Sequence, residues 1–227
     1  MRLTLIRHGQ TPSNVLHLLD TAAPGPGLTD FGKLQASDIP GKLEGRPVDA
    51  VYVSRLVRTH HTAAPLAYAR GLEAIELPGL HEIEAGDLEK RGDEEAVHAY
   101  MSTVFHWGRG DLDARMPGGP DGHEFFGRFD ADIARIAAEV QHPVVVSHGA
   151  AIRVWVAARA SNIDPEFTAV HHLPNTGIVE LEGSPEDGWQ LLSWPVEDAE
   201  GIQTFELVTT EPEAAPVGPT GEPADVD

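Results

Sequence analysis

Three short apolar segments, each followed at once by polar residues that suit the start of a helix, constrain the fold of this chain more than any other feature. They are the segments 2–6, 49–53 and 143–146. A short apolar run that leads into a helix is typical of a buried strand, and several such units predict a parallel sheet with helices on both faces. We therefore expect an α/β fold with a largely parallel sheet. In such sheets the ligand site lies beyond the carboxyl ends of the strands.

Chemically useful side chains stand at these three strand ends. Arg7 and His8 follow the first segment, Ser54 follows the second, and His148 follows the third. Helix N-termini favour anions and arginine offers a planar fork of donors, so a cation and an imidazole at the start of a helix suit a phosphate group. Because the three strand ends face one crevice, the sequence predicts a single phosphate site with His8 as its reactive group.

The rest of the chain continues the alternation of strands and helices. Capping residues, apolar periodicity and helix breakers set the boundaries of these elements. Helices are expected from Thr11 through Asn14, at 29–43 with an end or break near Pro40, at 54–69 with Ser54 as N-cap, and at 93–107, 124–140 and 149–160; strands are expected at 74–77, 177–181 and 189–194. The Gly- and Pro-rich segment 108–122 predicts a long loop that would serve as a lid.

The domain organisation follows from a change of composition near the end of the chain. Residues 1–208 are expected to form one catalytic domain. Residues 209–227 contain five acids, no base, and many Pro, Gly and Ala residues. Such a segment has too little apolar surface to offset the entropy of ordering, so we expect an acidic disordered tail.

The overall charge limits what the site can bind. The 227 residues carry a formal net charge of −20, which disfavours nucleic acid and anionic membranes as partners. A phosphate site must then be a small positive hollow within an acidic surface. The chain has no cysteine, and no His or carboxylate cluster has metal-ligand spacing, so neither a metal nor a cofactor is expected. Without an apolar run of roughly 20 residues or a signal-peptide pattern, a cytoplasmic location is expected.

Ordered motifs spread over the chain carry a resemblance to a known family. They are Arg7-His8-Gly9; Ser54-Arg55-Leu56-Val57-Arg58-Thr59 with Thr62-Ala63; Leu80-His81-Glu82 with Gly86; and Val146-Ser147-His148-Gly149 with Ile152-Arg153. In this order they resemble the histidine phosphatase superfamily, also called the phosphoglycerate mutase-like family, from about residue 1 to residue 181. The resemblance implies a three-layer α/β/α sandwich and a metal-independent phosphatase. Its substrate would be a small phosphorylated metabolite, hydrolysed in two steps: His8 is phosphorylated, and water then removes the phosphoryl group.

The same resemblance implies roles for individual side chains. The catalytic set holds a nucleophile, a proton donor and three groups that stabilise charge on the phosphoryl oxygens. The nucleophile is His8, the proton donor is Glu82, and the charge-stabilising groups are Arg7, Arg58 and His148. The phosphate-binding set consists of Arg7, Asn14, Arg58, His148 and Gly149. The family spacing selects Arg58 over Arg55 and Glu82 over Glu84, whereas the residues alone leave both choices open.

Two departures from the family pattern fall on the substrate side of the site. Asp87-Leu88-Glu89-Lys90 stand where the family often continues x-Trp-Glu-Gly after Gly86. Pro120-Asp121 stand where Glu-Ser usually follows Pro-Gly-Gly. These differences leave the identity of the phosphate ester open, as they leave the roles of His61, His171 and His172.

Two alternative functions are weighed against hydrolysis. Phosphoglycerate mutases of this family carry Arg and Tyr just after the acid, where this chain has Ile83, Glu84 and Ala85, so the sequence favours a phosphatase. An inactive phosphate-binding module is disfavoured because the expected catalytic residues are intact. The oligomeric state is left open, with a homodimer as the assembly considered.

Overall fold

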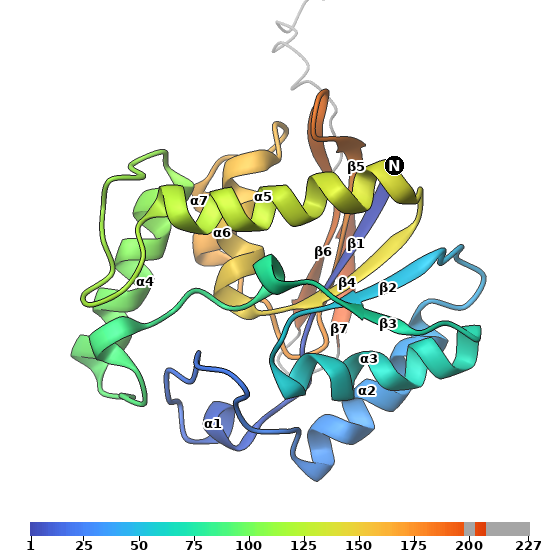
Figure 1. The fold of residues 1–227 in the computed structure, drawn as a ribbon, viewed down its shortest axis with the longest axis horizontal. Coiled ribbons are helices and arrows are strands. Elements are labelled where there is room, and N and C mark those ends of the chain that lie inside the picture. The colour runs from blue at the N-terminus through green and yellow to red at the C-terminus, as the bar shows by residue number, and fades with distance from the viewer. Residues whose placement is uncertain (198–202, 208–227) are drawn as a thin grey trace, which may run out of the picture.

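A sheet of seven strands forms the centre of the computed structural model, which describes residues 1–197 and 203–207. In spatial order the strands run β3-β2-β4-β1-β5-β6-β7 (Figure 1). Their bounds are β1 Arg2–Arg7, β2 Ala50–Val53, β3 Ala74–Glu76, β4 Pro143–Ser147, β5 Ile178–Ser184, β6 Gly188–Glu197 and β7 Gln203–Leu207. The expected tail at 209–227 lies outside the described residues.

The sheet divides into a parallel part and an antiparallel part. Strands β3, β2, β4 and β1 are mutually parallel, whereas β5 pairs antiparallel with both β1 and β6, and β6 pairs antiparallel with β7. Only residues 185–187 connect β5 to β6, and a connection this short forces an antiparallel pair. The predicted α/β class is confirmed, and the parallel order extends over four strands, including the three whose ends carry the expected site, β1, β2 and β4. Strand β7 was not predicted.

Helices cover both faces of this sheet (Figure 1). The structure describes α1 Pro12–Val15, α2 Asp30–Lys42, α3 Val57–Arg70, α4 Glu94–Gly108, α5 Gly122–Glu139, α6 Gly149–Arg159 and α7 Glu166–Val170, with short 3₁₀ helices η1 Pro78–Leu80 and η2 Gly86–Leu88. The expected helices are present, while α7 was not predicted. None of the described helices is both long and apolar enough to span a bilayer.

Alternating side chains of the strands bury the two faces against different helices. On one face Ile6 and Val146 pack with Ile39 of α2 and Leu66 of α3. On the other face the neighbouring residues along the same strands, Leu5 and Val145, pack into a larger core with α4, α5 and α6. This period of two, with both faces apolar, is what a buried parallel strand requires. The result is the expected three-layer α/β/α arrangement.

Candidate active site

A cavity of about 230 Å³ lies beyond the carboxyl ends of β1 and β4. It is lined by the end of β1, the segment 11–21, helices α3, α4 and α6, Glu82 and the residues 172–173. The lining residues are Arg7, His8, Thr11, Ser13, Asn14, Leu18, Leu19, Asp20, Thr21, Arg58, Glu82, Tyr100, Met101, Gly149, Ala150, Arg153, His172 and Leu173. The cavity therefore stands where the strand ends predicted it.

His8 follows β1 directly and is almost wholly buried. Its ring Nδ1 lies 2.8 Å from the carbonyl oxygen of Gly9. Because a carbonyl only accepts hydrogen bonds, Nδ1 carries the proton and Nε2 keeps its lone pair. Burial, together with the charges of Arg58 and Arg7, lowers the pKa of His8 well below its ordinary value of 6.5. His8 is thus a neutral imidazole at neutral pH, with Nε2 available as a nucleophile.

Two buried guanidinium groups stand beside this imidazole. Arg7 donates from Nη1 to the carbonyl oxygen of Leu173 at 2.6 Å, while its buried Nε has no hydrogen-bond partner within the described part of the chain. Burial lowers the pKa of Arg7 to about 10, and burial also lowers the pKa of Arg58, so both remain cations at neutral pH. A Cβ on Gly149 would lie 3.1 Å from Nε of Arg7, so glycine at this position leaves room for the guanidinium.

His148 lies behind His8, with the two ring centroids 5.2 Å apart. It is fully buried and does not line the cavity. Its Nδ1 accepts a hydrogen bond from Nε of Arg58 at 3.2 Å, and its Nε2 donates to Oγ of Ser54 at 2.8 Å. In this arrangement His148 orients Arg58. The expected contact between His148 and phosphoryl oxygens stays a prediction.

Ser54 therefore has a different place from the one predicted. The N-cap of α3 is Leu56, and the helix begins at Val57. The hydroxyl of Ser54 instead accepts from the Leu56 N–H at 3.2 Å and bonds the ring of His148. The prediction of a helix cap was wrong because a serine after a strand has the same local signature whether it caps a helix or bonds a distant side chain. Ser54 still lies at the site that the strand ends predicted, where its hydroxyl bonds His148.

Glu82 reaches the cavity from the segment between η1 and η2. Its Oε1 accepts from the N–H groups of Ile83 and Ala151 at 2.9 Å each, and its Oε2 accepts from the N–H of Ala150 at 3.2 Å. Two of these donors belong to the first turn of α6, where the helix dipole also favours a carboxylate. Glu84, the alternative acid, does not line the cavity.

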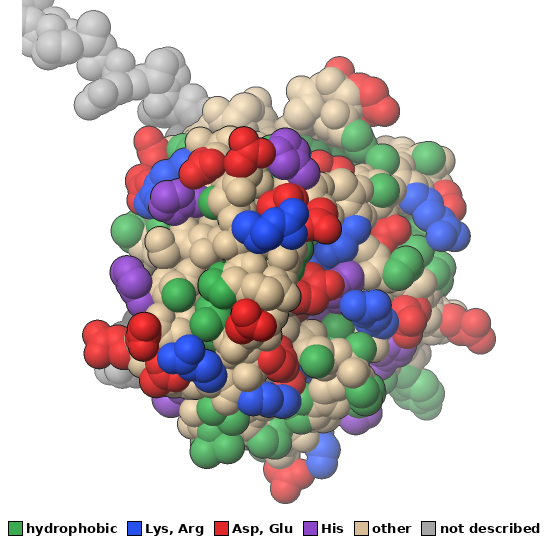
Figure 2. Space-filling model, turned by 60° about the vertical axis from the view of Figure 1, so that its left-hand side comes forward, with side chains coloured by type: hydrophobic (Ala, Val, Ile, Leu, Met, Phe, Trp, Pro, Cys, Tyr) green, Lys and Arg blue, Asp and Glu red, His purple; other side chains and the backbone are tan. Residues whose placement is uncertain are grey.

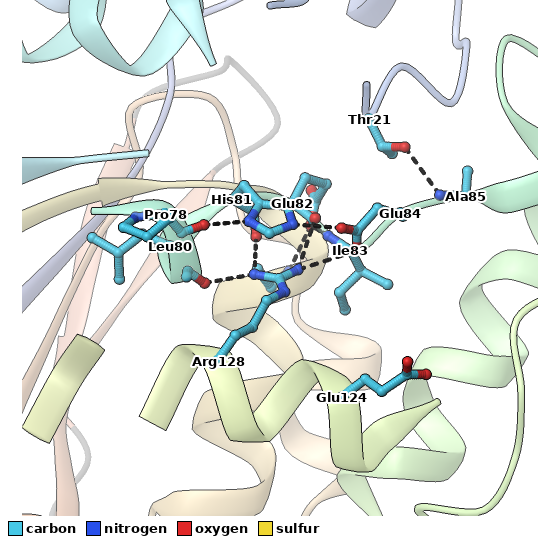
Figure 3. A network of polar contacts seen from close by, with 12 residues as sticks. Thr21, Pro78, Leu80, His81, Glu82, Ile83, Glu84, Ala85, Glu124 and Arg128 are labelled. Carbon is cyan, nitrogen blue, oxygen red and sulfur yellow. Dashed lines mark hydrogen bonds and ion pairs between the residues drawn. The ribbon is translucent and has the colours of Figure 1, made fainter. Parts of the chain in front are cut away.

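Arg128 of α5 holds the segment that carries Glu82 (Figure 3). Its guanidinium donates to the carbonyl oxygens of Gly79 at 2.5 Å, His81 at 2.7 Å and Glu82 at 2.9 Å. It also lies 3.4 Å from Oε2 of Glu84, whose Oε1 is bonded to Nε2 of His81 at 2.5 Å. Figure 3 shows these groups converging on the planar guanidinium. The backbone before and after Glu82 is thereby fixed from the neighbouring helix.

The remaining predicted residues differ in how they meet the cavity. Asn14 lines it, while its Oδ1 accepts from the N–H of Thr11 at 3.0 Å and so completes the cap of α1. Of the three histidines left open by the sequence, His172 lines the cavity and His61 and His171 do not. No residue of the expected lid, 108–122, takes part in the lining, although the structure describes that whole segment.

Two further parts of the lining carry no sequence signal. Leu18, Leu19, Asp20 and Thr21 come from an irregular segment without a motif, and Tyr100 and Met101 come from the middle of α4. Such residues become neighbours of His8 only through tertiary packing. Across the residues that the structure describes, no group of three or more His, Asp or Glu side chains is placed to hold a metal ion.

Comparison with known sequences identifies relatives of this chain. The family model of the histidine phosphatase superfamily (branch 1) matches residues 3–197. A PE-PGRS family protein of Mycobacterium tuberculosis is 37% identical over 209 residues, which are 85% of this chain but 36% of that relative, so the chain spans about a third of its length. An adenosylcobalamin/alpha-ribazole phosphatase of Salmonella typhimurium is 33% identical over 159 residues, 69% of this chain and 78% of the relative. A probable phosphoglycerate mutase of an Enterobacter species is 31% identical over 210 residues, covering 89% of this chain and 94% of the relative.

Solved structures with a similar fold include a phosphatase. The complex of a mycobacterial glucosyl-3-phosphoglycerate phosphatase with VO3 matches with a TM-score of 0.70 and 25% identity, over 85% of this chain and 98% of that one. The family match spans the six motif residues that line the cavity, which are Arg7, His8, Arg58, Glu82, Gly149 and Arg153. This chain belongs to the histidine phosphatase superfamily (branch 1).

Proposed function

We propose that this chain is a metal-independent phosphatase that hydrolyses a small phosphomonoester through a phosphohistidine on His8. The observation that carries the proposal is the state of His8, a buried neutral imidazole whose Nδ1 proton is held by Gly9 so that Nε2 is free. Arg7 and Arg58, together with Arg153, line the same cavity as His8. Phosphoryl transfer needs positioning and charge stabilisation, and two buried arginines supply both without a cation.

In the proposed first step, Nε2 of His8 attacks phosphorus and forms a P–N bond. The bond between phosphorus and the ester oxygen breaks, and the leaving oxygen takes a proton from Glu82. Arg7 and Arg58 stabilise the charge that spreads over the three remaining phosphoryl oxygens. His148 supports this step by orienting Arg58. A phosphomonoester bound as its monoanion brings the required proton into the cavity, where Glu82 is placed to receive it and pass it on.

In the proposed second step, water attacks the phosphorus of phosphohistidine. Glu82 now accepts the proton of that water, and the P–N bond breaks to restore neutral His8 and release orthophosphate. The same carboxyl group serves as acid and then as base, as microscopic reversibility demands. Glu82 then passes this proton to the orthophosphate, which leaves as its monoanion, so each cycle returns both side chains to their starting states.

A phosphoglycerate mutase is the second candidate, because one relative carries that name. The positions after the acid argue against it here. Ile83 and Ala85 are fully buried, and Glu84 is bonded to His81 and Arg128, so these positions present no cation to the cavity. With 3-phosphoglycerate as substrate, we expect orthophosphate to be released; isomerisation without phosphate release would instead establish a mutase.

The proposed intermediate is tested by rapid quench with a substrate labelled in the phosphoryl group, with EDTA present throughout. We expect an acid-labile, base-stable phosphoryl adduct on the wild-type chain, formed before orthophosphate appears. His8→Ala removes the nucleophile and should abolish both the adduct and turnover. An active His8→Ala enzyme would show that another group takes the phosphoryl transfer, and loss of activity in EDTA would show that a metal takes part.

The ligand, location and assembly of the chain are proposed on the same grounds. Its ligand is a small phosphorylated metabolite, and neither nucleic acid nor membrane is a proposed partner. A cytoplasmic location and a homodimer belong to the same proposal, and cell fractionation and light scattering test them. On the face in Figure 2, acidic and basic side chains are interspersed and no extended basic patch is present. Such a surface suits a small phosphorylated ligand better than a polyanion such as nucleic acid.

A further inference from the structure

Asp20 lines the same cavity as His8, yet the reaction proposed above does not use it. Its side chain is 5% exposed. Oδ2 has two partners at 2.5 Å, Nζ of Lys90 and the hydroxyl of Ser13. Oδ1 is buried and has no hydrogen-bond partner among the residues that the structure describes. Buried polar atoms in native proteins are nearly always hydrogen-bonded, so an unpartnered acceptor in a cavity wall indicates a place for a donor from the ligand.

The charge of Asp20 decides what kind of donor fits. Burial would raise the pKa of Asp20, but hydrogen bonds from Lys90 and Ser13, with the charges of Lys90 and Arg58, lower it below its ordinary value of 3.8. Asp20 is therefore an ionised carboxylate that can only accept hydrogen bonds. Lys90 already balances its negative charge. A neutral hydroxyl suits the free oxygen better than a second ammonium group, which would stand close to Lys90 and Arg58.

The segment around Asp20 is held rigidly from the chain that follows η2. Glu89 accepts from the N–H of Thr21 at 3.1 Å and from its hydroxyl at 2.5 Å. The N–H of Lys90 donates to the carbonyl oxygen of Leu19 at 2.6 Å, and Leu19 donates to Arg91 at 2.8 Å. Lys90 adopts a left-handed φ of 63°, a strained conformation for a residue with a Cβ. Asp20 is thus preorganised before any ligand binds.

These contacts involve one of the two departures from the family pattern. Glu89 and Lys90 are part of the segment Asp87-Leu88-Glu89-Lys90, which stands where the family often continues x-Trp-Glu-Gly. Glu89 matches the Glu of that pattern, whereas Lys90 stands in place of its Gly. Both side chains of this altered segment act on the wall of the cavity, Glu89 through Thr21 and Lys90 through Asp20. The departure therefore has a structural consequence at the place where the alcohol part of a substrate would lie.

We propose that Asp20 accepts a hydrogen bond from a hydroxyl group on the alcohol part of the substrate. The enzyme would then select phosphomonoesters of hydroxylated alcohols over those of plain alkyl alcohols. This inference rests on the proposed function, since it assigns the phosphoryl group to Arg7, His8 and Arg58. A ligand with a methyl group at this position would leave the carboxylate oxygen without a donor, and sites built to bond a hydroxyl reject such analogues strongly.

Matched phosphonates test this selection without requiring turnover. One set consists of 3-hydroxypropyl-, butyl- and 3-aminopropylphosphonate, which carry hydroxyl, methyl and ammonium groups at the same position. A second set, of 2-hydroxyethyl-, propyl- and 2-aminoethylphosphonate, is one carbon shorter. Calorimetry on the full-length chain should show the hydroxyl member of at least one set binding about tenfold tighter than its methyl counterpart, as expected for a hydrogen bond to a charged group.

Asp20→Asn identifies the residue responsible. Lys90 and Ser13 both donate to the second oxygen of Asp20, so they should hold the amide oxygen there and leave the amide N–H₂ at the free position. The variant then offers a donor where the wild type offers an acceptor, and the ratio of the two dissociation constants should fall from about ten to about one. Ser13→Ala removes one donor to the bonded oxygen only and should keep the preference. Asp113→Asn, at a side chain that is 96% exposed, is the matched control.

Each result decides the matter. Equal affinities for hydroxyl and methyl members in both sets of the wild type overturn the proposal, as does a preference that survives in Asp20→Asn. Tightest binding of the ammonium members would show that the cavity selects a cation instead. The His8-dependent hydrolysis of p-nitrophenyl phosphate is measured separately. Its failure would overturn the proposed function, whereas calorimetry alone judges the role of Asp20.

Discussion

The position of one proton distinguishes the two histidines of the site. In His8 the Gly9 carbonyl holds the proton on Nδ1, which leaves Nε2 free. In His148 the Arg58 N–H occupies Nδ1, so the proton lies on Nε2 and is donated to Ser54. Identical side chains thus have different capabilities because their backbone and side-chain neighbours differ. Of these two histidines, only His8 keeps a nitrogen lone pair without a partner among the described residues, which is why we assign it the attack on phosphorus.

Glu82→Gln tests the proton donor. An alkoxide leaves poorly without a proton, so the variant should lose about 10²-fold or more in kcat with an alkyl phosphate. The loss should be much smaller with p-nitrophenyl phosphate, because p-nitrophenolate scarcely needs a proton to leave. Steady-state kinetics on both substrates give the comparison, and Glu95→Gln, at a side chain that is 90% exposed, is the control. Equal losses on the two substrates would assign Glu82 to binding or structure.

Single residues also mark how far the sequence could be interpreted. The family spacing chose Arg58 over Arg55, and in the structure Arg58 lines the cavity while Arg55 lies outside it, 3.8 Å from Glu84. Asp20 could not be found in this way. A carboxylate in an irregular segment resembles a solvated charge, and its burial depends on contacts with residues about 70 positions later in the chain. Such burial is a property of tertiary packing that no local pattern encodes.

At the scale of elements, α5 determines where Glu82 stands. Arg128→Met should remove the hydrogen bonds to three carbonyl groups and the ion pair with Glu84 while keeping an unbranched side chain of comparable length. If Arg128 positions Glu82, kcat with an alkyl phosphate should fall by about tenfold or more, and kcat with p-nitrophenyl phosphate much less. Arg128→Lys should restore part of the loss.

The leaving-group comparison separates positioning from general destabilisation. We expect Arg128→Met also to lower the free energy of unfolding by about 2 kcal/mol or more, because buried carbonyls lose their donor. Damage to the whole domain would reduce turnover of both substrates alike, and that result would contradict a specific role. Arg135→Met changes an exposed arginine of the same helix and should alter neither quantity appreciably.

The elements that the sequence predicted best are those with a strong local signal. Strands β1, β2 and β4 are short, mostly apolar runs, and α5 begins with a capping box at Asp121 and Glu124. Helix α7 and strand β7 have five residues each, too few for a clear period. The start of α3 was misplaced because the hydroxyl of Ser54 serves His148. Local sequence patterns therefore predicted the parallel strands and the site at their ends. The short elements α7 and β7 and the start of α3 depend on tertiary contacts and could not be predicted in this way.

At the scale of the whole molecule, a net charge of −20 coexists with a site built for a phosphate. Arg7, Arg58 and Arg153 line one cavity, and the pKa of Arg153 falls to about 10 through burial and the charge of Arg7. A cluster of like charges in a buried place costs stability that the fold must supply elsewhere. A bound dianion relieves this repulsion. Affinity for phosphate is thus built into the cavity, and the acidic surface contributes nothing to it.

The same burial makes the stability of the whole chain depend on pH. His8 and His148 are fully or almost fully buried, and desolvation, with nearby Arg58, lowers the pKa of both well below 6.5. In the unfolded chain each titrates near 6.5. Below that pH the unfolded state binds two protons that the folded state does not. The free energy of unfolding should therefore be constant for these groups above pH 6.5 and fall as the pH drops, by up to about 2.7 kcal/mol per unit for the pair.

Urea denaturation between pH 7.5 and 5.0 measures this slope, and a variant assigns it. His148→Gln removes one of the two titrating groups, so its slope below pH 6.5 should be smaller by about 1.4 kcal/mol per unit, whatever its stability at pH 7.5. Two acids with strongly shifted pKa values do not contribute to the slope in this pH range. The pKa values of Glu84 and Asp93 are lowered to about 2, so the stability they confer is lost only below about pH 4.5. An unchanged slope in His148→Gln would mean that His148 is protonated in the folded chain, and its hydrogen bond from Arg58 could then not exist as described.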